Sequence, residues 1–114
     1  MTTASKQQAN HPVVGELTPY MSFLRTGFGM FRTAQYHGLA KVVDNHLHIL
    51  AIAAFERGQG RLSLFLNRCE DAYHSVTVWD LWNQRLAAYL KRRGYRPTVD
   101  PEGVEGLTNL PPLP

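Results

Sequence analysis

Residues 46–66 read HLHILAIAAFERGQGRLSLFL, an apolar run followed by a glycine-containing turn and then by an apolar pattern of a different period. The first part, up to Phe55, has the length and composition of a strand. After Gly60, apolar residues recur every three or four positions as far as Tyr73, which predicts an amphipathic helix. No side chain is placed to cap the start of this helix, so its first N–H groups are open to a ligand or to water.

The residues before this stretch predict an antiparallel meander. Residues 29–36 and 39–43 have the pattern of strands, and the dipeptides His37-Gly38 and Asp44-Asn45 are typical of tight turns. A short helix is expected over residues 18–25, with Thr18 as its cap and Pro19 at its first position.

The residues after it predict a strand over 75–82, a helix from Asn83 to Gly94 with a cap at each end, and a strand over 95–99. The Gly- and Pro-rich end allows at most an edge strand near residues 107–110. The fold expected is α/β (α+β): one domain over 18–100, with a mixed, mostly antiparallel sheet, a central parallel strand pair and helices on its faces. Residues 1–17 and 101–114 are expected to be terminal tails.

Composition excludes several classes of protein. The chain has 114 residues, a net charge of +3 and a single cysteine, so a two-domain enzyme and an internal disulfide are excluded. Cys69 lies on the apolar side of the first predicted helix and is expected to be buried. The sequence has no apolar run long enough to span a membrane and no signal-peptide pattern, which favours the cytoplasm.

The ordered motifs resemble those of the GNAT superfamily of N-acetyltransferases. In that family a strand precedes a loop of the form Arg or Gln, two residues, Gly, one residue, then Gly or Ala. The loop is followed by a helix, a strand and a second helix. This second helix begins near Asn and ends in Gly-Phe or Gly-Tyr. Here Arg57 and Gly60 occupy the first two fixed positions, Asn83 the asparagine, and Gly94-Tyr95 the ending. The resemblance implies a GNAT-like fold reduced at its N-terminus.

The resemblance also implies a site for acetyl-coenzyme A as co-substrate, with no metal, and transfer of the acetyl group to an amine whose identity stays open. Glu56 is the candidate base and Tyr89 the candidate acid. The residues implied to contact the coenzyme are Ile52, Ala53, Ala54, Arg57, Gly58, Gln59, Gly60, Arg61, Leu62, Ser63 and Asn83.

A second interpretation is a non-catalytic GNAT-like interaction or structural protein. Leu62 stands where the family has a small residue, and Leu90 stands where it often has the tyrosine that protonates the departing thiolate. Compact proteins of this kind resemble ones encoded by bacteriophages, as virion components or as factors directed at the host. A protein partner or a homo-oligomer is then expected.

Three other patterns have simpler explanations. His46 and His48 share a strand face, but no third metal ligand is evident, so two strand histidines are favoured. Trp79 and Trp82 are expected to pack in the core. The basic residues over 91–96 are those that a helix C-terminus favours, so nucleic acid is not an expected partner.

Overall fold

The computed structural model describes residues 10–20, 26–55 and 61–111 of the chain. Its elements are β1 (Asn10–His11), β2 (Gly15–Glu16), β3 (Thr18–Pro19), β4 (Gly29–Arg32), β5 (Tyr36–Val43), β6 (His46–Ala54), α2 (Leu62–Ala72), β7 (Ser75–Trp79), α3 (Gln84–Arg92), β8 (Arg96–Val99) and β9 (Glu105–Thr108). Seven strands form one sheet in the order β3-β4-β5-β6-β7-β9-β8, and β1 pairs with β2 separately.

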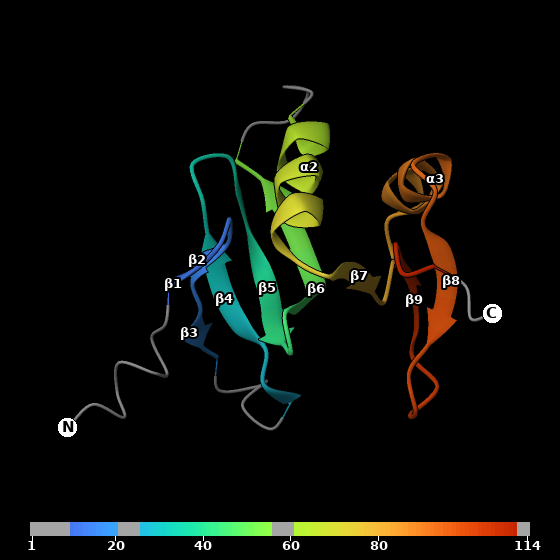
Figure 1. Ribbon diagram of the computed structural model, residues 1–114, viewed down its shortest axis with the longest axis horizontal. Coiled ribbons are helices and arrows are strands. Elements are labelled where there is room, and N and C mark those ends of the chain that lie inside the picture. Colours follow the sequence, from blue (N-terminus) through green and yellow to red (C-terminus); the bar gives the residue numbers. More distant parts are fainter. Residues whose placement is uncertain (1–9, 21–25, 56–60, 112–114) are drawn as a thin grey trace.

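Only β6 and β7 are parallel neighbours in the large sheet, and its other described pairs are antiparallel. The predicted fold class is therefore confirmed: a mixed, mostly antiparallel sheet with a central parallel pair and helices packed against it (Figure 1). None of the described helices is long and apolar enough to cross a membrane.

The predicted meander is present as β4, β5 and β6, and one of its two predicted turns is confirmed. Asp44 and Asn45 have positive φ angles of 52° and 64°, as a two-residue hairpin turn requires. The turn predicted at His37-Gly38 is wrong, because both residues lie inside β5. Residues 33–35 turn the chain instead, since the Thr33 hydroxyl accepts a hydrogen bond of 3.0 Å from the N–H of the first residue of β5.

The helix predicted over residues 18–25 is wrong at its start. Thr18 and Pro19 form the edge strand β3, which pairs with Met30 and Gly29 of β4. A proline lacks an N–H group and is tolerated at a sheet edge, so the same two residues suit a strand as well as a helix start. Residues 21–25, where the rest of that helix was predicted, lie outside the described residues.

The C-terminal strand was predicted at the edge of the sheet and lies inside it. β9 pairs with β7 on one side and with β8 on the other, so β8 is the edge strand. At the other end of the chain, Val14 in the β1–β2 hairpin is fully buried in the main core. The folded body thus includes residues on both sides of the 18–100 range.

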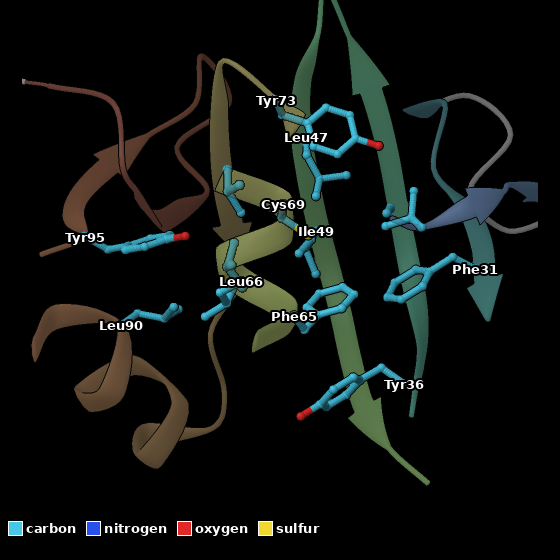
Figure 2. Close-up of a cluster of buried hydrophobic side chains, with 14 of the residues drawn as sticks. Phe31, Tyr36, Leu47, Ile49, Phe65, Leu66, Cys69, Tyr73, Leu90 and Tyr95 are labelled. Carbon is cyan, nitrogen blue, oxygen red and sulfur yellow. The ribbon is translucent and has the colours of Figure 1, made fainter. Parts of the chain in front are cut away.

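Both described helices pack on one face of the sheet, which we call the helix face. It is the face that carries Leu47 and Ile49, and Figure 2 shows Phe65 of α2 lying against it, with Leu90 of α3 in the same cluster. Cys69 of α2 is fully buried there, as predicted, and burial raises the pKa of its thiol to about 12. A thiol in this state is a packing group and not a nucleophile.

Candidate functional site

The parallel strands β6 and β7 stop pairing before β6 ends. Their last paired residues are Ile49 and Val78, yet β6 continues to Ala54 while β7 ends at Trp79. Asp80, the next residue, has a positive φ of 55°, which turns the chain out of the strand direction. The main chain of β6 beyond Ile49 therefore makes no ladder hydrogen bonds with β7.

A β-bulge bends β6 at the point where this pairing ends. The residues on either side of Leu50 pair with consecutive residues of β5, which leaves Leu50 as the extra residue. The bulge shifts the alternation of side chains, so that buried Ile49 is followed on the helix face by Ile52 and Ala54. Ala53 is exposed on the opposite face. Of the three residues of β6 implied to contact the coenzyme, Ile52 and Ala54 thus lie on the helix face and Ala53 does not.

Helix α2 begins without a side-chain cap, as predicted. Arg61 occupies the cap position, its side chain makes no capping hydrogen bond, and the first turn has no acidic residue. Such a helix start carries partial positive charge and attracts anions. Leu62 is half-buried and packs against the core, and Ser63 is half-buried beside it. The other implied residues of this loop lie outside the described residues: Glu56, Arg57, Gly58, Gln59 and Gly60.

Asn83 caps helix α3, as predicted. Its side-chain oxygen accepts hydrogen bonds from the N–H groups of Arg85 at 3.0 Å and Leu86 at 3.1 Å. The oxygen is therefore engaged by the helix, and the side-chain NH₂ is the group that Asn83 can offer to a ligand. Trp82, which was predicted to pack in the core, is instead 86% exposed.

Tyr36 is a residue of this region that sequence analysis missed. It lines a small hollow of about 140 Å³ together with Arg61. Burial raises the pKa of the Tyr36 hydroxyl, Tyr89 raises it further, and Arg61 opposes both effects. Figure 2 shows this hydroxyl pointing to the side of the sheet where α3 lies. Tyr36 at the start of β5 and Arg61 before α2 thus line one hollow, whereas Leu90 is fully buried.

A charged cluster joins α2 to the end of α3. Arg93 donates to the two carboxylate oxygens of Glu70 at 2.8 and 2.9 Å, and it also donates to Asn67. The Tyr95 hydroxyl donates to the same carboxylate at 2.6 Å. Burial acts to raise the pKa of Glu70, but the hydrogen bonds from Arg93 and Tyr95 outweigh it and lower this pKa. The cluster fixes how the two helices that flank the site lie relative to each other.

Replacing Glu70 with glutamine is expected to lower the free energy of unfolding by about 2 kcal/mol near neutral pH, because charge-assisted hydrogen bonds are lost. The folded-state pKa of Glu70 is lowered. Its contribution is therefore present above the unfolded-chain pKa of about 4.3 and disappears as the pH falls through the folded-state value. Urea unfolding curves of both proteins should converge in acid.

The matched control is Asp71→Asn, which removes the same charge from an exposed neighbour. It should change the unfolding free energy by no more than about 0.5 kcal/mol at any pH. A Glu70→Gln deficit that is equally large in acid would show that the carboxylate charge is not what stabilises the cluster.

His46 and His48 lie on one strand face, as predicted, and each contacts a neighbouring side chain. His46 Nδ1 is 2.6 Å from the hydroxyl of buried Ser75. The ring N–H of Trp79 donates to Nδ1 of His48 at 3.0 Å. Burial first, then the charges of Lys41 and His46, lower the pKa of His48. Within the described ranges, no group of three or more His, Cys, Asp and Glu side chains is placed to hold a metal ion.

Comparisons with family models, with curated proteins and with solved structures find no match for this chain. The function proposed below therefore rests on the geometry of the described residues and on the resemblance of the motifs. The geometry consists of the early end of the β6–β7 pairing, the uncapped start of α2 and the hollow that Tyr36 and Arg61 line.

Proposed function

We propose that this chain is a small acetyltransferase that binds acetyl-coenzyme A and transfers its acetyl group to an amine. The observation that carries the proposal is the early end of pairing between β6 and β7, next to a helix with no side-chain cap. Main-chain groups are then available in two places, along β6 beyond Ile49 and at the first turn of α2. The coenzyme has two parts that match them. Its extended amide chain can pair with the main chain of β6, and its pyrophosphate can bind the N–H groups at the start of α2.

The chemistry proposed is direct transfer. The amine nitrogen attacks the thioester carbonyl, a C–N bond forms and the C–S bond breaks. A base takes the proton that the attacking nitrogen loses, and the departing thiolate takes a proton from an acid. Main-chain N–H groups of β6 would hold the carbonyl oxygen while negative charge develops on it. Acetyl-coenzyme A is a cytoplasmic metabolite, so the cytoplasm is the place of action under this proposal.

The residue roles follow the same proposal. Glu56 remains the candidate base from the motif, and Tyr89 remains the candidate acid. The position of Tyr36 in the same hollow as Arg61 supports a second candidate acid, since a phenol carries its proton near neutral pH. Leu90 is buried where the family often has its tyrosine. This supports the alternative of a non-catalytic interaction or structural protein with the same fold, such as one that a phage encodes.

Calorimetric titration with acetyl-coenzyme A tests the binding step. Arg61→Glu places a negative charge at the start of α2 and should weaken binding about tenfold or more, because it repels the pyrophosphate. The matched control is Arg96→Glu on the edge strand β8, which should leave the affinity within about threefold. Undetectable binding by the unmodified chain, or equal losses in the two variants, would overturn the proposed site.

Acetyl transfer is measured separately from binding, by release of the free thiol with a mixture of amines. Binding without release would support the non-catalytic alternative. Release that is halted by Tyr36→Phe but not by Tyr89→Phe would assign the acid to Tyr36, and the opposite result would assign it to Tyr89.

A further inference from the structure

The face of β4, β5 and β6 that points away from the helices is exposed, and we call it the open face. No helix within the described ranges packs on it. Met30 and Phe55 project from it and are 42% and 44% exposed. It also contains a hollow of about 400 Å³, floored in part by Ala51 and Ala53. Contiguous apolar surface of this kind marks interaction sites more often than an isolated exposed side chain does.

The charge of the open face has one sign. β4, β5 and β6 contain no aspartate or glutamate. The register of the strands places all their basic side chains on the open face: Arg32, His37, Lys41, His46 and His48. Arg32 and Lys41 carry positive charge near neutral pH, so the surface that exposes these apolar side chains is also positively charged.

Packing holds these charges in place. The guanidinium of Arg32 lies 4.8 Å from the centre of the Phe55 ring, and the His37 ring lies 4.8 Å from the same ring. The ammonium of Lys41 lies 4.7 Å from the centre of the Phe28 ring and donates to the carbonyl of Thr26 at 3.0 Å. Side chains that are already ordered lose less entropy when a partner binds.

We propose that the open face binds an acidic amphipathic segment of a partner protein, with an apolar side chain in the hollow and carboxylates beside Arg32 and Lys41. This surface lies on the face of β6 opposite the helices and the start of α2, and the proposal does not depend on acetyl transfer. A second copy of the chain would bring positive charges against positive charges. Single-stranded nucleic acid stacks its bases on open aromatic faces, whereas Arg32 already covers Phe55 and the hollow is largely aliphatic.

The probe is a short synthetic peptide of leucine, phenylalanine and glutamate with one acidic and one apolar side, titrated into the full isotope-labelled chain. Amide shift changes should be confined to β4, β5 and β6. Arg32→Glu should weaken binding about tenfold or more because it introduces a like charge. Arg85→Glu, at an exposed position of α3, is the matched control and should leave binding unchanged. Thermal unfolding confirms that both variants are folded.

Four results would overturn the proposal. One is equal binding of the same peptide with lysine in place of glutamate. Another is shift changes on α2 and α3, or none at all. The third is tighter binding of oligothymidylate than of the acidic peptide, which would assign the face to nucleic acid. Sedimentation as a dimer that Met30→Glu abolishes would instead assign the face to a second copy.

Discussion

Replacing Gly38 with alanine is expected to lower the free energy of unfolding by about 3 kcal/mol, at the upper end of the usual cost of overpacking. A Cβ atom at this position would lie 1.9 Å from the carbonyl oxygen of Ala51 and 2.9 Å from the ring of Phe31. The oxygen belongs to the main chain inside the sheet, so it cannot move aside as a flexible side chain would. Urea unfolding measures the loss.

The comparison variant is Gly103→Ala, in the turn between β8 and β9. Nothing lies within 4 Å of a Cβ at Gly103, but its φ is +90°. Alanine there should cost about 1 kcal/mol, from backbone strain alone. If Gly38→Ala were no less stable than Gly103→Ala, the pairing of β5 with the bulged part of β6 would be different from the one described.

Gly38 also shows why part of the fold could not be predicted from sequence. Glycine marks a turn and equally marks a strand position that another main chain approaches closely, and His37-Gly38 was interpreted as a turn. The distinction depends on the bulge at Leu50, a long-range feature with no local signal. The turn that does form depends on a hydrogen bond to the hydroxyl of Thr33. A single threonine is a weaker sequence signal for a turn than a dipeptide that contains glycine.

The elements that were predicted well carry local signals. Asp44-Asn45 accommodates positive φ, the apolar stripe of α2 has a clear helical period, and Asn83 caps the helix that follows it. The place of β9 between β7 and β8 is the opposite case. It follows from which strands pair, and a Gly- and Pro-rich segment gives no indication of a partner.

The candidate site also has features that could be predicted from local sequence and one that could not. The uncapped start of α2 and the parallel strand pair were expected from the order of motifs, and both are present in the described residues. Tyr36 was missed because Arg61, with which it lines a hollow, comes from a distant part of the chain. Only the packing of α2 against β5 brings Tyr36 and Arg61 to one hollow.

Replacing Leu90 with tyrosine, the residue that the resemblance implies near this position, is expected to destabilise the protein by about 3 kcal/mol and not to create an acid. Leu90 is fully buried on the helix face. A larger ring would overpack the core, and its hydroxyl would lose hydrogen bonds to water. Thermal unfolding and the thiol-release assay measure the two effects.

Ala88→Tyr is the matched control, since Ala88 is exposed on the same helix. It should cost about 0.5 kcal/mol, the difference in helix propensity. If Leu90→Tyr were as stable as this control and released thiol faster than the unmodified chain, position 90 would face the reacting groups. The acid would then belong there, and neither Tyr36 nor Tyr89 would be needed. We expect the reverse, because a side chain that α3 buries among Leu66, Tyr95 and their neighbours cannot reach a ligand held along β6.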